Sequence, residues 1–357
     1  MLTKIKGVVG AFILGSGCLF GALFLLVPLC PLAFWRKTHG IYRFYNDFIF
    51  STWLTFAIAI IRLFHGVEII THGDWILPID KAIVTLNHRT RLDWLYFWST
   101  AITDGFLLDL KIVLKRSLAR APGAGWAMQL ASFLFLKRRA EVDLPRIEHH
   151  LKYLSQFKSR AFKLLLFPEG TDYCPNGKKK SDEFADKNGL PRYEFVLHPR
   201  TTGVDFAFKT LRSHQYLDAI YDVTVAYDGP FPCSELAVVT GDLPKRVRFF
   251  VKRYPADVVE KAGPKFWSEI WEEKEKFLEA YYSGDINPEN GRCEGQLANL
   301  VEVISIVVWL FFLLYTFIVI LPTYWFYVLI LTVGMFYWSE FTSNSIDGSI
   351  VLAGSDE

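Results

Sequence analysis

Long apolar segments at both ends of the chain constrain its fold more than any other feature. Residues 7–34 contain no charged side chain, and residues 301–320 and 323–338 form two further apolar runs separated by Pro322. A helix of about 20 apolar residues is long enough to cross a bilayer. The sequence therefore predicts a membrane protein. Its hydrophobic content of 52% is above that of an ordinary soluble protein, and the excess is concentrated at the two ends.

The first apolar segment is predicted to be a retained anchor, because a signal peptide has a shorter apolar core of about 7–15 residues. Residues 48–63 form a second apolar stretch that is short for a full span. We expect it to be a helix beneath the membrane interface or a re-entrant pair with the first segment. The two C-terminal runs predict a transmembrane hairpin, with a single kinked span as the alternative.

Between residues 69 and 254, short β-rich runs alternate with amphipathic segments. This rhythm predicts an α/β domain with a mixed sheet flanked by helices. Strands are expected at residues 82–86, 112–114, 162–167, 221–226, 237–240 and 247–251, and helices at residues 94–102, 126–134, 144–157, 204–211 and 264–282. The lysine-rich residues 176–181 are expected to form a flexible loop.

Two polar blocks each follow an expected strand. His88 and Asp93 come after the apolar residues 83–86, and residues 167–172 (Phe-Pro-Glu-Gly-Thr-Asp) come after residues 164–166. An imidazole near a carboxylate can take a proton from a hydroxyl, although such a pair alone is more often a surface turn. Five residues turn about 140° around a straight helix, so the pair cannot share one helix face. We therefore expect His88 in a loop and Asp93 in the first turn of the next helix, where an acidic group is favoured.

Four blocks in this order resemble those of the glycerolipid (lysophospholipid) acyltransferase superfamily. Asn87-His88-(x4)-Asp93 and residues 167–171 are similar to its two signature blocks. Residues 115–118 with 122–129 resemble the second block of the eukaryotic branch. Residues 193–203 are similar to the fourth block as it stands in lysocardiolipin acyltransferases, and residues 271–275, at the tail of the catalytic region, also resemble that subfamily. The resemblance covers residues 67–285.

This resemblance implies transfer of a fatty acyl chain from acyl-CoA, a co-substrate and not a bound cofactor, to the free hydroxyl of a lysophospholipid. His88 would be the general base, and Asp93 would orient its ring. Glu169, Gly170 and Thr171 are implied to hold the glycerol-phosphate of the acceptor. No covalent intermediate is expected, because the coenzyme thiol is a good leaving group and no Ser or Cys lies in a G-x-S-x-G elbow.

Basic residues are the predicted ligands of the substrate phosphate. Many members of the superfamily carry an arginine where this chain has Asp172, so phosphate binding is assigned to Arg91, Lys115, Arg116 and Arg200. The planar guanidinium of arginine can grip phosphate oxygens with two hydrogen bonds. The alternative interpretation of each of these residues is an ordinary charged side chain on the protein surface.

Two further groups in the blocks have more than one interpretation. Residues 137–139 (Lys-Arg-Arg) are expected to meet lipid head groups or coenzyme phosphates. Gly123, Gly125 and Trp126 could line an acyl channel, or the glycines could simply form a tight turn.

Asp172 also bears on the acceptor. An acidic residue repels a lone terminal phosphate, whose second ionisation lies near pH 6, more than it repels a phosphodiester. The sequence therefore favours lysophosphatidylinositol or lysocardiolipin over lysophosphatidic acid, with lysophosphatidylcholine last, in phospholipid remodelling. The alternatives are a lysophosphatidic acid acyltransferase in phospholipid synthesis and a non-catalytic protein that binds anionic lipids. A membrane hydrolase is disfavoured because it would need a nucleophile motif.

The predicted organisation comprises membrane-anchoring helices (residues 1–66), a catalytic domain (67–285), a linker (286–299), transmembrane segments (300–340) and a polar tail (341–357). The five cysteines show no metal-ligand spacing, so neither a metal site nor a disulfide framework is expected. A net charge of +2 gives no reason to expect nucleic acid as a partner. The expected partners are the two substrates and the bilayer, and the oligomeric state is left open. We expect a multi-pass protein of the endoplasmic reticulum, or of mitochondria-associated membrane, whose catalytic domain faces the cytosol, where acyl-CoA is made.

Overall fold

The computed structural model describes residues 2–229, 236–288, 291–293, 296–341 and 346–354. In these residues, one seven-stranded sheet has the order β1-β7-β6-β2-β5-β3-β4. Strands β6 and β7 are antiparallel, and the other neighbouring pairs are parallel. The strands are β1 (Glu68–Gly73), β2 (Ala82–Leu86), β3 (Leu110–Lys115), β4 (Leu134–Leu136), β5 (Lys163–Leu166), β6 (Ala219–Asp228) and β7 (Arg246–Pro255). The predicted mixed α/β sheet is confirmed.

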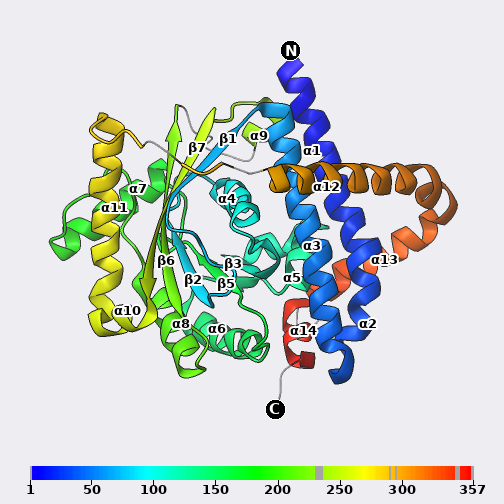
Figure 1. Ribbon diagram of the computed structural model, residues 1–357. Helices are drawn as coiled ribbons and strands as arrows, with labels where there is room; N and C mark the ends of the chain where they lie inside the picture. Colours follow the sequence, from blue (N-terminus) through cyan, green and yellow to red (C-terminus); the bar gives the residue numbers. More distant parts are fainter. Residues whose placement is uncertain (1, 230–235, 289–290, 294–295, 342–345, 355–357) are drawn as a thin grey trace.

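Helices cover both faces of the sheet (Figure 1). The helices between residues 93 and 283 are α4 (Asp93–Thr103), α5 (Ala124–Leu130), α6 (Ala140–Ser155), α7 (Pro175–Asn188), α8 (Thr201–Ser213), α9 (Leu236–Thr240), α10 (Ala256–Ala262) and α11 (Phe266–Ser283). The central strand β2 is buried along its whole length, as parallel strands between two helical layers usually are. Its side chains alternate, since Val84 packs in the core with α4, whereas Ile83 packs in the core with α6, α8 and α11.

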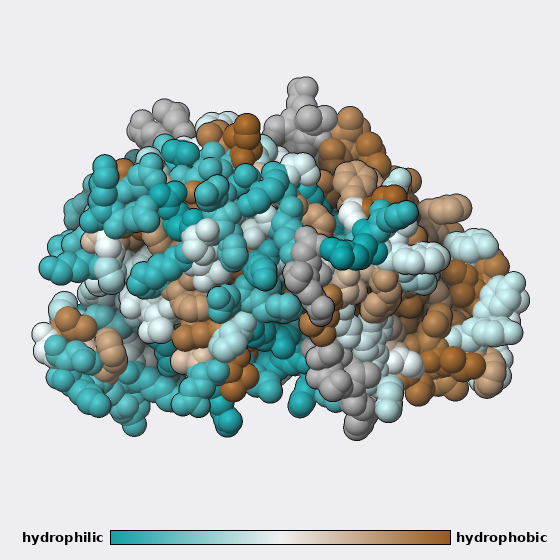
Figure 2. Space-filling view, turned by 90° about the horizontal axis from the view of Figure 1, so that it is seen from below, coloured by the Kyte–Doolittle hydropathy of each residue, from teal (hydrophilic) through white to brown (hydrophobic). Residues whose placement is uncertain are grey.

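The terminal helices lie on one side of the sheet domain (Figure 1). They are α1 (Leu2–Gly21), α2 (Cys30–Ala33), α3 (Arg36–His65), α12 (Gln296–Tyr315), α13 (Leu321–Phe341) and α14 (Ile346–Gly354). Among the residues that the structure describes, three helical stretches are long and apolar enough to cross a membrane, at Ile5–Ala33, Arg36–His65 and Asn299–Glu340. Hydrophobic residues gather on this side of the molecule, and hydrophilic residues cover the sheet domain (Figure 2). The predicted membrane character is therefore confirmed.

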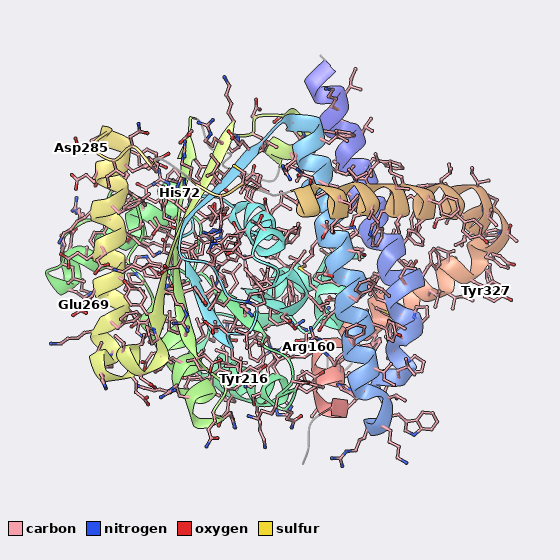
Figure 3. All side chains as sticks on the ribbon, in the orientation of Figure 1. His72, Arg160, Tyr216, Glu269, Asp285 and Tyr327 are labelled. Atoms are coloured by element: carbon pink, nitrogen blue, oxygen red, sulfur yellow. The ribbon has the colours of Figure 1, made fainter. Side chains whose placement is uncertain are left out.

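Helix α3 is longer than the sequence predicted. The apolar residues 48–63 indicated only a short helix, but α3 has 30 residues and begins at Arg36. Its first half is polar on the side that faces the sheet domain, where buried Asp47 accepts hydrogen bonds from Lys111 at 2.8 Å and Arg160 at 2.6 Å. Arg160 lies between the sheet and α3 (Figure 3). These long-range ion pairs stabilise polar residues inside the helix. A prediction based on apolar residues alone therefore makes the helix too short.

The C-terminal helices form a bent arm. Residues Thr316–Ile320 are π-helical, and Tyr324 has non-helical backbone angles just after Pro322, where a helix is expected to kink. α12 runs away from the sheet domain and α13 returns toward it, with Tyr327 near the far end (Figures 1 and 3). This shape agrees with the hairpin that we expected from the two apolar runs.

Five of the expected strands are present, and three local predictions are wrong. Residues 237–240 were expected to be a strand, but they belong to helix α9. This helix packs so closely on α1 that a Cβ at Gly7 would lie 2.1 Å from the Val239 carbonyl oxygen. Residues 176–181 belong to α7, which has Pro175 in its first turn and Gly189 as a left-handed C-cap. Leu134 belongs to strand β4 and not to the helix that precedes it.

The predicted polar tail also contains ordered structure. Residues Ile346–Gly354 form α14, whose Ile346 and Ile350 are fully buried. Buried Asp347 accepts hydrogen bonds from Arg116 at 3.3 Å and from Arg146. The part of the tail at residues 342–345 and 355–357 lies outside the described residues. Through α14, the chain returns to the sheet domain after the apolar arm.

The glycines of the second block serve close packing. Gly123 has a φ of +73°, and a Cβ there would lie 2.5 Å from the Cα of Leu19 in α1. A Cβ at Gly125 would lie 2.3 Å from the carbonyl oxygen of Ala119, and Trp126 is buried. Of the two interpretations of these residues, the structure supports the tight turn, which presses the sheet domain against the first membrane helix.

Candidate active site

The two polar blocks meet at one edge of the sheet. Strands β5, β2 and β6 are neighbours and run parallel. Their carboxyl ends, at Leu166, Leu86 and Asp228, therefore lie at the same edge of the sheet. Parallel α/β sheets commonly bind ligands outside the carboxyl ends of their strands. Residues 87–93 follow β2, and residues 167–172 follow β5.

Asn87 separates strand β2 from the first block. Its side-chain oxygen accepts a hydrogen bond from the Val225 amide at 2.7 Å, and its side-chain nitrogen donates to the Val225 carbonyl at 3.3 Å. The buried amide thereby replaces backbone pairing between β2 and β6 and lets the chain leave the sheet. The loop that carries His88 therefore starts from a fixed point.

His88 and Asp93 are hydrogen-bonded. His88 Nδ1 lies 2.9 Å from Asp93 Oδ2, and the Asp93 carboxylate is fully buried. The Thr90 amide donates to the same oxygen at 3.0 Å. His88 lies in the loop after β2, and α4 starts at Asp93. The predicted placement of this pair, loop followed by first helical turn, is confirmed.

The His88 ring is held but remains accessible. It packs against the Phe167 ring with a centroid distance of 4.3 Å, and 17% of its side chain is exposed. With Nδ1 used by Asp93, Nε2 makes no hydrogen bond to any residue that the structure describes. A neutral imidazole with its proton on Nδ1 would present the Nε2 lone pair to a ligand.

Glu169 lies behind the site and not at its surface. The residue is 3% exposed, and its Oε1 accepts a hydrogen bond from the Trp271 indole at 3.4 Å. Burial raises the pKa of Glu169 to about 7, although the His88 ring and the backbone amides of His88 and Leu197 lower it. The expected direct contact between Glu169 and a substrate phosphate is thus not supported. Its side chain joins the His88 loop to α11.

Gly170 and Arg200 lie together. Gly170 has a φ of +72°, which favours glycine, and a Cβ there would lie 3.3 Å from Cδ of Arg200. The Arg200 amide donates to the Pro168 carbonyl at 2.7 Å. The fourth block is thereby brought against the third, with Thr171 partly exposed beside them. The predicted phosphate ligand Arg200 is therefore placed directly on this turn.

Arg138 joins the same cluster. It has a φ of +64°, which is uncommon for a residue other than glycine. Asp143 fixes this conformation by accepting hydrogen bonds from the Lys137 and Arg139 amides, each at 2.8 Å. Burial, followed by the charge of Arg200, lowers the pKa of Arg138, and Asp172 raises it. The sequence predicted that residues 137–139 meet lipid head groups or coenzyme phosphates, but the backbone conformation of Arg138 could not be predicted from it.

Residues 64–228 match the family model described as "Acyltransferase". The chain is 39% identical over 317 residues to lysocardiolipin acyltransferase 1 of Mus musculus, which covers 86% of this chain and 84% of that protein. It is 40% identical over 322 residues to the Gallus gallus protein of the same name, with coverage of 87% and 84%. The chain belongs to the lysophospholipid acyltransferase family. Lysophosphatidylinositol acyltransferase 10 of Caenorhabditis elegans is 37% identical over 251 residues, or 69% of this chain and 64% of that protein.

Two predicted phosphate ligands of this acyltransferase lie elsewhere along the sheet edge. Lys115 ends β3 and is exposed, but no contact joins it to the His88 loop among the described residues. Arg116 is held by the buried carboxylate of Asp347, so its assignment as a phosphate ligand is not supported. Arg91 pairs with Asp172 at 3.4 Å and remains half exposed. The acyltransferase therefore gathers Arg91, Arg138 and Arg200, but not Arg116, around the Gly170 turn.

Across the part of the acyltransferase that the structure describes, no group of three or more His, Cys, Asp or Glu side chains could hold a metal ion. The chemistry available at the site is that of an imidazole, a buried carboxylate and several guanidinium groups. This set suits proton transfer next to an anionic ligand.

Proposed function

We propose that this acyltransferase moves a fatty acyl chain from acyl-CoA to the free hydroxyl of an anionic lysophospholipid in one direct transfer. The observation that carries the proposal is the hydrogen bond between His88 Nδ1 and buried Asp93. This bond leaves Nε2 available to take the proton of an approaching hydroxyl. The partly exposed position of His88 at the sheet edge supports that role.

The reaction would proceed through a tetrahedral intermediate. His88 Nε2 takes the proton of the lipid hydroxyl while the hydroxyl oxygen bonds to the thioester carbonyl carbon. The carbon–sulfur bond then breaks, and the imidazolium returns its proton to the departing coenzyme thiolate. Asp93 stabilises the imidazolium between these two steps, as the carboxylate does in a catalytic triad.

The arginine cluster supports an anionic acceptor. The cluster contains three guanidinium groups (Arg91, Arg138 and Arg200) and one carboxylate (Asp172), so its net charge is positive. Guanidinium groups bind phosphate oxygens with directed hydrogen bonds. Asp172 can accept hydrogen bonds from hydroxyl groups on a head group, which favours a phosphodiester bearing hydroxyls.

Lysophosphatidylinositol or lysocardiolipin is therefore the proposed acceptor. The names of the relatives, lysocardiolipin acyltransferase 1 and lysophosphatidylinositol acyltransferase 10, agree with this choice. Lysophosphatidic acid is the second candidate, because two neighbouring arginines, Arg138 and Arg200, could hold a doubly charged phosphate. We further propose that residues 67–285 face the cytosol from a membrane of the endoplasmic reticulum or a mitochondria-associated membrane.

An acceptor panel tests the proposal. The full chain, purified in detergent micelles, would be given labelled oleoyl-CoA with lysophosphatidylinositol, monolysocardiolipin, lysophosphatidic acid or lysophosphatidylcholine. We expect the first two to be acylated best, and we expect His88→Ala to lower the labelling rate of every acceptor by at least about a hundredfold. Preference for lysophosphatidylcholine would contradict the assignment of an anionic acceptor. Labelling at close to the wild-type rate in His88→Ala would contradict the assigned base.

A further inference from the structure

A tyrosine from another strand contacts the buried partner of His88. Tyr227 lies near the carboxyl end of β6, 134 residues after Asp93 in the chain, and its hydroxyl donates a hydrogen bond to Asp93 Oδ1. Its side chain is 1% exposed. The motifs in the sequence do not include this residue, because the contact depends on β6 lying beside β2.

The two oxygens of Asp93 have separate partners. Oδ2 receives the His88 ring and the Thr90 amide. Oδ1 receives the Tyr227 hydroxyl and, at 3.3 Å, the Thr90 hydroxyl. The bonds from His88 and Thr90 arise within the same short block, whereas Tyr227 ties the carboxylate to the sheet. A carboxylate held at both oxygens cannot rotate away from the imidazole.

Tyr227 is itself well fixed. Its backbone amide donates to the Tyr282 hydroxyl at 3.1 Å, which connects it to α11. Its ring meets the Tyr96 ring edge-on, with centroids 6.2 Å apart. Burial, followed by the negative charge of Asp93, raises the pKa of Tyr227 well above its ordinary value. The hydroxyl therefore keeps its proton at neutral and mildly alkaline pH and remains a donor.

We infer that Tyr227 is a positioning residue for acyl transfer, which fixes the Asp93 carboxylate and moderates its charge so that Asp93 orients His88 while leaving the ring neutral. The inference rests on the proposed role of His88 as general base. A hydrogen bond from a hydroxyl withdraws charge from a carboxylate, so Asp93 attracts a proton on the imidazole less strongly. Without Tyr227, the carboxylate would hold the imidazolium more tightly, and less neutral base would be present at pH 7.

Other titratable groups surround the pair and stay in place in the Tyr227→Phe variant. The carboxylate of Glu169, in the loop after β5, is near enough to His88 for the charge of that ring to lower its pKa. Tyr96 on α4 and Tyr282 on α11 sense the charge of Asp93, and Arg89 acts on Tyr282. A change confined to the Tyr227 hydroxyl leaves all four unaltered.

The experiment compares Tyr227→Phe with Tyr96→Phe in the purified full chain. The Tyr96 hydroxyl is also buried beside Asp93, but it has no hydrogen-bond partner among the described residues. Both changes remove one oxygen from the same core and keep the aromatic ring. Activity with oleoyl-CoA and lysophosphatidylinositol would be measured as kcat, KM and the pH dependence of kcat/KM, whose acid limb reports the pKa of the free base.

For Tyr227→Phe we expect a fall in kcat of about tenfold, the usual size of one hydrogen bond to a charged group, with KM changed by less than about twofold. The acid limb should also move to higher pH by about half a unit. Its position does not depend on the folded fraction, so it stays informative if the variant is less stable. Tyr96→Phe should leave kcat, KM and the limb near wild type.

An unchanged acid limb and kcat in Tyr227→Phe would overturn the inference. An equal loss in Tyr96→Phe would also overturn it, because packing would then explain both variants. His88→Ala separates this result from the proposed function. If His88→Ala is inactive while Tyr227→Phe matches wild type, only the positioning role fails, whereas an active His88→Ala removes the proposed base itself.

Discussion

Glu169→Gln is expected to stabilise the folded protein at neutral and alkaline pH. Burial raises the pKa of Glu169 from its ordinary 4.5 to about 7, against the lowering effects of His88, Leu197 and Trp271. Between these two pH values the folded protein keeps a proton on Glu169 that the unfolded chain releases. The free energy of unfolding therefore falls as the pH rises through this window.

The size of this effect follows from the pKa difference. The difference between 4.5 and about 7 corresponds to about 3 kcal/mol once the pH exceeds the folded value, and to less than about 1 kcal/mol near pH 5. Glutamine has the shape of the protonated acid and carries no charge at any pH. The variant therefore avoids the cost of burying an ionised carboxylate and retains an oxygen for the Trp271 indole.

Thermal unfolding of the detergent-solubilised protein measures this difference. The midpoints of wild type and Glu169→Gln should nearly coincide at about pH 5, and the variant should unfold several degrees higher at about pH 8. Glu269→Gln is the control, because Glu269 lies exposed on α11 (Figure 3). A difference between wild type and Glu169→Gln that stays constant from pH 5 to 8 would refute the reasoning.

Three further outcomes are expected. Arg200→Ala should raise the apparent KM for the acceptor about tenfold and the KM for acyl-CoA much less. The control Lys209→Ala, at an exposed position on α8, should change neither KM. An effect of Arg200→Ala confined to acyl-CoA would contradict the assignment of Arg200 to the acceptor. Asp347→Asn should lower the thermal midpoint, because it removes a fully buried carboxylate held by two arginines. The control Asp257→Asn, whose carboxylate is 75% exposed, should change the midpoint little. Equal changes in both variants would contradict the stabilising role of the buried ion pairs. Protease added to sealed microsomes should digest residues 67–285, and protection until detergent is added would place this region in the lumen.

Much of the sheet could be predicted, because its strands are short apolar runs that end at polar blocks. Ala82–Leu86 was predicted with its observed bounds. The placement of His88 and Asp93 also followed from helix geometry, since five residues cannot put both side chains on one face. β1 was missed because Glu68–Gly73 mixes polar and apolar residues and pairs with β7, far along the chain.

The remaining features depend on contacts between distant residues. Tyr227 reaches Asp93 because β6 lies next to β2. Arg138 turns toward Arg200 because Asp143 fixes the backbone on both sides of it. The sequence marks these residues only as an aromatic and several charges, and nothing local identifies their partners.

Helix α3 and Glu169 illustrate the same limit for buried polar groups. Asp47 interrupts an apolar pattern, and only the distant cations Lys111 and Arg160 make it acceptable inside the protein. Glu169 belongs to a block that the sequence placed at the substrate, yet it is buried against Trp271. Motif spacing locates such residues along the chain but does not say which of them face the ligand.

The most direct test of the account is the acyl transfer rate of His88→Ala, measured with oleoyl-CoA and lysophosphatidylinositol at saturating concentrations. Removal of a general base should lower kcat by about 10²–10⁴, while the amount of folded protein in the membrane stays near wild type. His149→Ala is the matched control, because His149 lies exposed on α6. Loss of activity in His88→Ala alone is the predicted result. A His88→Ala variant that transfers acyl chains as fast as His149→Ala would contradict direct transfer by His88.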